Sequence, residues 1–278
     1  MKRIILVFVV VCFISCSPKL RTSIINKLPA LPEKELVVVL DILDDQIISG
    51  EKVGEIKATD IGLSNNCSYY ENIHNLKTLA RQSGANLIKL TAHKKPDKWS
   101  TCDRLWATIY KVDDVKFYET EIDWTPNRKL TWDDFKGKPD LEEFPNALAV
   151  TNSGISYESG AINVFKEGKI FIRCVFFNRG SWVIPEGKTD YVLRHEQIHF
   201  DITEIYSRML RKEIQDANLT PNNSVRIKAI YDNIMAQWEK RQARYDYQTK
   251  KGAKKETQEE WEAIVKIELA KYELYKAN

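Results

Sequence analysis

One long stretch of this chain, residues 190–213, contains neither glycine nor proline and is therefore free to form a long helix. Apolar and ring-bearing side chains recur in it every three or four residues, which is the period of one helix face. They are Val192, His195, His199, Ile202, Tyr206 and Met209. Thr189 or Asp190 can cap the start. The sequence thus predicts a helix that turns two histidines towards the protein interior.

Within this stretch His195, Glu196 and His199 form the pattern H-E-x-x-H. Histidines four positions apart lie on one helix face, near enough to share a metal ion. Glu196 lies about 100° around the helix, beside the ion, where it can act as general base towards an attacking water. The motif therefore predicts a zinc site with peptidase chemistry. The alternative is a helix whose two histidines are satisfied by structural hydrogen bonds.

The third ligand of such a site is expected to be a carboxylate, because the chain has four histidines and the other two lie far upstream. Asp201 and Glu204 follow the motif but point away from the face of the histidines. We expect them to be supporting or structural groups, with Arg208 or Lys212 as a partner.

The next predicted helix offers two better carboxylates, Asp246 and Glu239. If this helix folds back as a helical hairpin, Glu239 could come level with the histidines. Asp246 lies in residues 245–249, which resemble a block of a bacterial domain family described below, and we favour it as the metal ligand. The alternative for both is an exposed helix carboxylate.

The N-terminus indicates export. Lys2 and Arg3 precede an apolar run over residues 4–14, which is too short for a membrane span and typical of a secretory signal. The run ends at Cys16, in a context that resembles the bacterial lipobox, so Cys16 is the expected lipidation site. An ordinary signal peptide or an N-terminal anchor helix is the alternative. The proline-containing residues 17–34 are predicted to be a polar tether.

Composition is consistent with an exported globular protein of 278 residues, with 43% hydrophobic and 29% charged residues. A net charge of +3 gives no case for nucleic acid as the main partner. The expected partners are a peptide or protein substrate and, through the lipid, a membrane. The expected location is the bacterial envelope, on the periplasmic side of the outer membrane.

Three cysteines remain once Cys12 leaves with the signal and Cys16 carries the lipid. A disulfide is permitted outside the cytoplasm, and we expect it between Cys67 and Cys102. Cys174 lies in a strand-like run and is predicted to be a buried free thiol.

Residues 35–114 are predicted to form a small α+β domain in the order β-β-α-β-β. The predicted strands are residues 36–40, 53–56, 87–91 and 105–112, and the helix is residues 73–83. The block over residues 76–90 is similar to the core of the outer-membrane sensor lipoprotein of the Rcs envelope-stress pathway. That resemblance implies a fold and a disulfide but no activity. An unrelated α+β accessory domain is the alternative.

Residues 115–278 are predicted to form a second domain, with an antiparallel sheet and three C-terminal helices. The predicted strands are residues 117–124, 147–157 and 169–177, followed by the short strand 181–183. The motif helix comes next. Thr220 and Pro221 are expected to start the second helix, and a capping box of Thr257 and Glu260 the third.

Four blocks of this domain resemble one bacterial domain family of unknown function, described as secreted zinc-dependent proteases. They are residues 130–135, 149–157, 181–183 and 194–204. The resemblance covers residues 116–278 and implies a zincin-like fold. Residues 245–249 resemble a further family block, in which a histidine commonly stands where this chain has Lys251.

These observations together predict an α+β protein that is a membrane-anchored zinc metallopeptidase of the bacterial envelope. In that reading Glu196 is the general base and zinc is the cofactor. The alternative is a non-catalytic envelope lipoprotein, a sensor or metal-binding module whose protease-like domain is degenerate.

Overall fold

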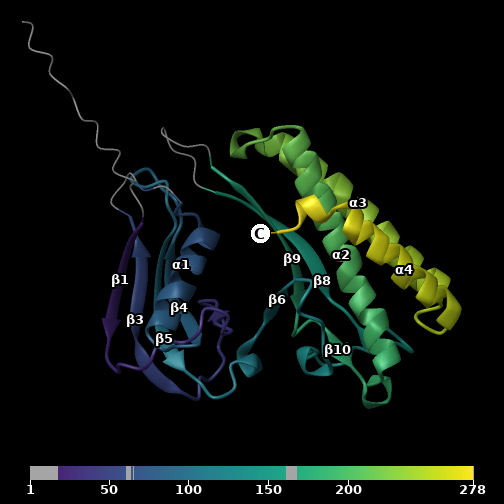
Figure 1. The fold of residues 1–278 in the computed structure, drawn as a ribbon, viewed down its shortest axis with the longest axis horizontal. Helices are drawn as coiled ribbons and strands as arrows, with labels where there is room; N and C mark the ends of the chain where they lie inside the picture. Colours follow the sequence, from purple (N-terminus) through teal and green to yellow (C-terminus); the bar gives the residue numbers. More distant parts are fainter. Residues whose placement is uncertain (1–17, 61–63, 65, 161–167, 278) are drawn as a thin grey trace, which may run out of the picture.

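The computed structural model describes residues 18–60, 64, 66–160 and 168–277. Figure 1 shows an N-terminal domain built on a sheet, and a second domain in which long helices lie against a smaller sheet. The predicted α+β class, with antiparallel strands and three C-terminal helices, is confirmed. The expected signal peptide and Cys16 lie outside the described residues.

The N-terminal sheet has five strands in the order β1-β3-β5-β4-β2. They are β1 (Lys19–Ile24), β2 (Val38–Leu40), β3 (Glu51–Thr59), β4 (Leu87–Lys94) and β5 (Arg104–Lys111). Neighbours run antiparallel except β2 and β4, which are parallel. Helix α1 (Tyr69–Gln82) packs its buried Leu76 and Ala80 against the sheet residues Val53, Ile88 and Leu105.

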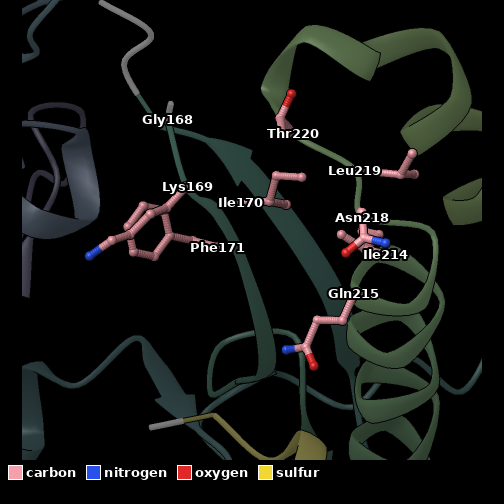
Figure 2. Close-up of a pocket in the computed structure, with 9 residues that line it drawn as sticks. All are labelled: Gly168, Lys169, Ile170, Phe171, Ile214, Gln215, Asn218, Leu219 and Thr220. Atoms are coloured by element: carbon pink, nitrogen blue, oxygen red, sulfur yellow. The ribbon is translucent and has the colours of Figure 1, made fainter. Parts of the chain in front are cut away.

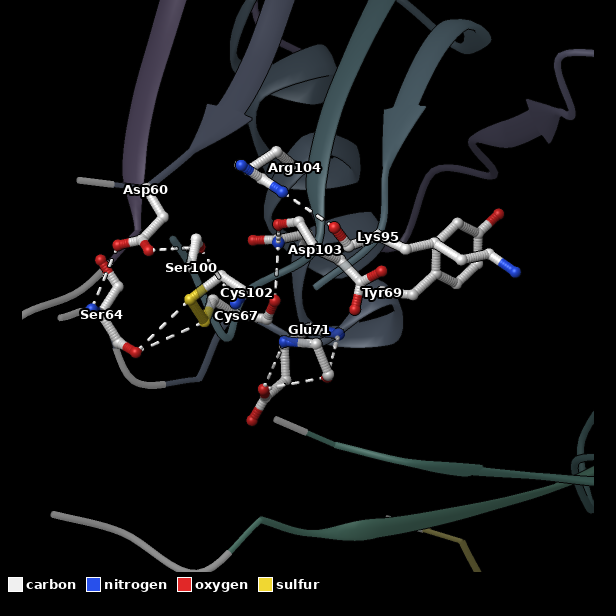
Figure 3. Close-up of a disulfide and its surroundings, with 12 residues drawn as sticks. Asp60, Ser64, Cys67, Tyr69, Glu71, Lys95, Ser100, Cys102, Asp103 and Arg104 are labelled. Carbon is white, nitrogen blue, oxygen red and sulfur yellow. Dashed lines mark hydrogen bonds between the residues drawn. A yellow bond between two sulfur atoms is a disulfide. The ribbon is translucent and has the colours of Figure 1, made fainter. Parts of the chain in front are cut away.

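Helix α1 begins at Tyr69, earlier than the predicted start at residue 73, because Ser68 and Glu71 form a capping box. Cys67, just before the cap, forms a disulfide with Cys102, just before β5 (Figure 3). This is the pair expected from the sequence, and it fastens the start of the helix to the sheet.

The prediction of a polar tether over residues 17–34 differs from the structure. Lys19–Ile24 form β1, which pairs with β3 from Lys19↔Thr59 to Ile24↔Gly54. All six side chains of β1 are exposed, so backbone hydrogen bonds to the free edge of β3 hold the strand. Leu28 then packs against the core, where a β-carbon on Gly84 (φ +78°) would approach it to 2.5 Å.

The second domain has a three-stranded antiparallel sheet in the order β6-β9-β8. Its strands are β6 (Glu121–Asp123), β8 (Ser153–Ser159) and β9 (Ile170–Phe177), and a separate pair joins β7 (Ala149–Val150) to β10 (Trp182–Val183).

Two predicted strands of this domain are divided in the structure. Residues 117–124 contain the end of a 3₁₀ turn, Lys116–Tyr118, and then β6. Residues 147–157 change partners at Asn152, whose N–H binds the hydroxyl of Ser181 and whose carbonyl accepts from Phe177. The segment before Asn152 therefore pairs with β10, and the segment after it pairs with β9.

Three helices cover one face of the sheet: α2 (Asp190–Asp216), α3 (Ser224–Thr249) and α4 (Lys255–Lys271) (Figure 1). Helix α2 lies on the strands, where Phe200 packs against Phe176 and the free thiol of Cys174 is buried. Burial raises the pKa of that thiol, which is consistent with a structural role.

The predicted helix starts need correction. Thr220 caps a 3₁₀ turn, Pro221–Asn223, and α3 starts at the next residue, Ser224. Helix α4 begins at Lys255, and its N-cap Lys254 makes no side-chain capping bond. The predicted capping box of Thr257 and Glu260 is therefore wrong, since α4 has already begun before Thr257.

The N-terminal domain lies against the face of the second sheet opposite the helices (Figure 1). Tyr70 of α1 contacts the ring of Phe171 and the guanidinium of Arg173 on β9. Glu158 of β8 accepts a hydrogen bond from the backbone N–H of Tyr69, 3.3 Å away. The second sheet is therefore packed on both faces. Among the described helices, none combines the length and apolar character of a membrane span.

Candidate metal centre

Helices α2 and α3 run as neighbours and bring three metal-ligating side chains together. The Nε2 atoms of His195 and His199 are 3.2 Å apart. Oδ1 of Asp246, on α3, lies 3.3 Å from the first and 3.2 Å from the second. Among the described residues, these three form the one group of such side chains that could hold a metal ion. Glu239, the other candidate ligand, is exposed and stands outside the group.

The three ligand atoms form a nearly equilateral triangle whose size suits zinc. Ligand atoms bound at 2.0–2.2 Å in a tetrahedron lie about 3.3–3.6 Å apart, and the distances here, 3.2–3.3 Å, lie at the short end of that range. Two imidazoles and a carboxylate are also a donor set that catalytic zinc uses. The side chain of Asp246 is 38% exposed, against 6% for His195 and 13% for His199. The site therefore opens to solvent on the Asp246 side.

Gln242 fixes the orientation of His199. Its Oε1 lies 2.7 Å from Nδ1 of His199. Since an amide oxygen can only accept, Nδ1 carries a proton, and in the neutral imidazole Nε2 then has the lone pair that a metal would bind. The Nε2 of Gln242 donates to the backbone carbonyl of His199 and to Thr203. Sequence reasoning missed Gln242, although it stands four residues before Asp246, on the same face of α3.

The ring of His195 is held by packing. Tyr245 stacks on it with ring centres 4.6 Å apart and planes 21° from parallel. Gly252 lies against it, so close that a β-carbon there would be 3.4 Å from Cγ and from Nδ1. The Nδ1 atom is buried and has no hydrogen-bond partner among the residues that the structure describes.

The hydrogen bonds and charges within this group shift the pKa values of His199 and Asp246 in opposite directions. Burial lowers the pKa of His199, but the hydrogen bond and charge of Asp246 outweigh it and raise that pKa to about 9. Burial raises the pKa of Asp246, but hydrogen bonds from His195 and His199 outweigh it and hold that pKa well below its usual range. Near neutral pH the metal-free site therefore contains an ionised Asp246 paired with a protonated His199.

Glu196 lies beside these three residues, close enough for its charge to act on His199. It is 4% exposed, and its Oε2 is buried with no partner among the described residues. The backbone carbonyl of Glu196 accepts from Thr151, between β7 and β8, which fixes this turn of the helix against the strands. A buried carboxylate oxygen without a partner is costly unless a ligand or water completes it. The unpaired oxygen of Glu196 is therefore a position at which a ligand or water could bind.

Lys251 has a defined place at the end of α3. It adopts the left-handed conformation, and its N–H donates to the carbonyl of Asp246, 2.8 Å away. Its backbone therefore closes the helix turn that carries the third candidate ligand, while the residue is exposed.

The carboxylates that follow the motif lie outside the site, as the helix geometry predicts. Asp201 accepts the indole N–H of Trp124 at 2.7 Å, and burial raises the pKa of Asp201. Glu204 pairs with Arg208 at 2.8 Å, one of the two partners expected, whereas Lys212 does not contact it in the ion pairs of the described residues. Both groups link the helix to its surroundings.

A groove of about 690 Å³ lies elsewhere, between the start of β9 and the C-terminal end of α2 (Figure 2). Its lining residues are Gly168, Lys169, Ile170, Phe171, Ile214, Gln215, Asn218, Leu219 and Thr220. Ile214 is about 28 Å from His195 along the helix axis. The groove therefore has no part in the candidate metal centre.

Residues 182–266 match a family model described as a bacterial protein of unknown function (DUF922). The match runs from β10 into α4 and includes the two histidines, Glu196 and Asp246. It is shorter than the resemblance expected over residues 116–278. No curated protein and no solved structure matches the chain. The description of the family as zinc-dependent proteases, and the likeness of residues 35–114 to the Rcs sensor, stay predictions.

Proposed function

We propose that this protein is a membrane-anchored zinc metallopeptidase of the bacterial envelope. The observation that carries the proposal is the triangle of His195, His199 and Asp246, whose ligand atoms have the spacing of a tetrahedral zinc site. A buried carboxylate with one oxygen that has no partner among the described residues, Glu196, accompanies it.

Each residue has a distinct role in this proposal. His195, His199 and Asp246 hold the ion, which when bound acidifies water and polarises a peptide carbonyl. Glu196 takes the proton of the attacking water and passes it to the leaving amine, as a general base and then a general acid. Gln242 keeps His199 in the tautomer that presents Nε2.

The proposed location rests on the N-terminus and on the disulfide. Residues 4–14 have the character of a signal sequence, and Cys16 follows as the proposed lipidation site. The disulfide of Cys67 with Cys102 supports a compartment outside the cytoplasm. The proposed substrate is a peptide or protein that reaches the membrane surface.

Two observations favour a second candidate, a non-catalytic lipoprotein that senses or binds metal. A protonated His199 paired with Asp246 satisfies much of the site without an ion. In addition, Lys251 stands where the resembling family commonly has a histidine. In this reading the domain has kept a metal-binding or structural site and has lost the reaction.

The test compares the full-length protein, purified in detergent, with four variants. Zinc is measured by elemental analysis, and cleavage is measured on a mixed peptide library. We expect one zinc in the wild type and in Glu196→Gln, with cleavage lost in that variant. His199→Ala and Asp246→Ala should lose zinc. The matched control Glu239→Gln changes an exposed carboxylate of the same helix and should keep both properties.

The outcomes separate the candidates. A wild-type protein that binds no zinc contradicts the metallopeptidase proposal. A wild-type protein that binds zinc through the three residues but cleaves no peptide supports the second candidate.

A further inference from the structure

Two buried polar atoms beside the metal centre have complementary chemistry and no partners. Nδ1 of His195 and Oε1 of Gln258 each lack a hydrogen bond among the described residues. Gln258 lies in the first turn of α4 and is fully buried. Buried polar atoms are almost always satisfied in native proteins. Two adjacent exceptions therefore require an explanation.

The two atoms flank the same glycine. A β-carbon on Gly252 would lie 3.4 Å from Nδ1 of His195 and 3.6 Å from Oε1 of Gln258. Since residue 252 is glycine, it places no side chain between them. The Nε2 of Gln258 donates to the carbonyl of Tyr191, one helical turn before His195. The amide is thus anchored beside the histidine by its nitrogen, and its oxygen is unused.

Glu262 keeps the amide in this orientation. Its Oε1 lies 3.5 Å from Nε2 of Gln258, so a carboxylate faces the donor end of the amide. Reversing the amide would set its oxygen against that carboxylate. The oxygen of Gln258 is therefore the end that remains for His195.

Metal binding gives this oxygen a partner. An imidazole that binds a metal through Nε2 carries a proton on Nδ1, and metal-bound histidines almost always donate that proton to a neighbouring acceptor. His199 already has such an acceptor in Gln242, 2.7 Å away on α3. His195 has none among the described residues, and Gln258 is the buried acceptor beside it.

We propose that Gln258 is a positioning residue for the metal centre, whose Oε1 accepts the Nδ1–H of His195 in the metal-loaded protein, directly or through one water. The inference rests on the proposed zinc site. It makes α4 part of that site: each histidine is oriented by a glutamine, one from α3 and one from α4. It also gives Gly252 a role, since a side chain there would obstruct the contact.

The test uses the full-length protein with zinc alone as the ligand, and measures affinity by competition with a chelator. Gln258→Leu removes the acceptor and should weaken zinc binding about 10- to 100-fold. Gln258→Glu keeps an acceptor but loses the donor to Tyr191, and should bind zinc at least as tightly as the wild type. The control Gln248→Leu removes a glutamine that joins α3 to Trp261 of α4 without touching a histidine, and should leave the affinity unchanged.

A second readout is independent of affinity. In zinc-loaded wild-type protein labelled with ¹⁵N-histidine, we expect a slowly exchanging Nδ1–H for His195, which is lost in Gln258→Leu. Thermal unfolding of the metal-free variants separates loss of stability from loss of positioning.

The results that overturn the inference are distinct from those that overturn the site. Wild-type affinity in Gln258→Leu rejects the positioning role alone. Equal weakening by Gln258→Leu and Gln258→Glu also rejects it, because the contact to Tyr191 then explains the effect. A wild-type protein that binds no zinc rejects the metal site and this inference together.

Discussion

Zinc binding is expected to compete with a proton that His199 and Asp246 hold between them. Only the neutral imidazole binds zinc, and the charge and hydrogen bond of Asp246 overcome the opposing effect of burial to raise the pKa of His199 to about 9. At pH 7, two units lower, about 1% of His199 is neutral, so the apparent zinc affinity should be about 100-fold below its plateau. It should rise about tenfold per pH unit up to pH 9.

Chelator competition between pH 6.5 and 9.5 measures this slope. Calorimetry in buffers of different ionisation enthalpy should count close to one proton released per zinc at pH 7.5. Asp246→Asn removes the charge that raises the pKa of His199. This variant should bind zinc more weakly throughout, with little dependence on pH above 7.5. A wild-type affinity that stays constant between pH 7 and 8.5 would refute the reasoning.

Three further predictions follow from the same structure. The metal-free protein should lose up to about 3 kcal/mol of stability as the pH rises from 6.5 through 9. The reason is that the pKa of His199 is higher in the folded than in the unfolded protein, so its stabilising effect is complete only below pH 6.5. Urea unfolding at pH 6 and 9.5 tests this, with zinc-loaded protein as the control. Burial and then the charge of Asp103 raise the pKa of Glu158 from 4.5 to about 7, so the cost of ionising it in the folded protein develops between these two pH values and is complete above pH 7. Glu158→Gln should therefore stabilise the protein at pH 8, by about 1–2 kcal/mol after screening, and have little effect at pH 5; equal melting shifts at both pH values would count against this. Replacing Cys67 and Cys102 by serine removes a link between residues separated by 35 positions. The free energy of unfolding in urea should fall by about 3–4 kcal/mol. A loss under about 1 kcal/mol would show that the unfolded chain is already restrained without the disulfide.

The sequence predicts those parts of the site that are marked by a pattern of neighbouring residues. The helix that carries His195 and His199 follows from a periodic run without helix breakers. The expectation of a carboxylate follows from the lack of a further histidine nearby, and the choice of Asp246 over Glu239 follows from the resemblance of residues 245–249 to a family block. The structure places Asp246 beside the histidines and leaves Glu239 exposed.

The missed features depend on packing between distant segments. Gln242 and Gln258 are neutral residues of ordinary helices, and their place beside a histidine exists only once α3 and α4 have packed on α2. Strand β1 escaped prediction for another reason. Its six side chains are exposed, its short run has only Leu20 and Ile24 as large apolar residues, and its stability comes from backbone pairing with β3.

If Cys16 carries the proposed lipid, the position of β1 also limits how far the protein can stand from a membrane. The strand begins at Lys19, and three residues span at most about 10 Å. A lipid on Cys16 would therefore hold the outer edge of the N-terminal sheet close to the headgroups. The proposed catalytic domain lies on the opposite side of that sheet in Figure 1. Its reach would be set by the breadth of one small domain, so the enzyme would act on chains within a narrow layer above the bilayer.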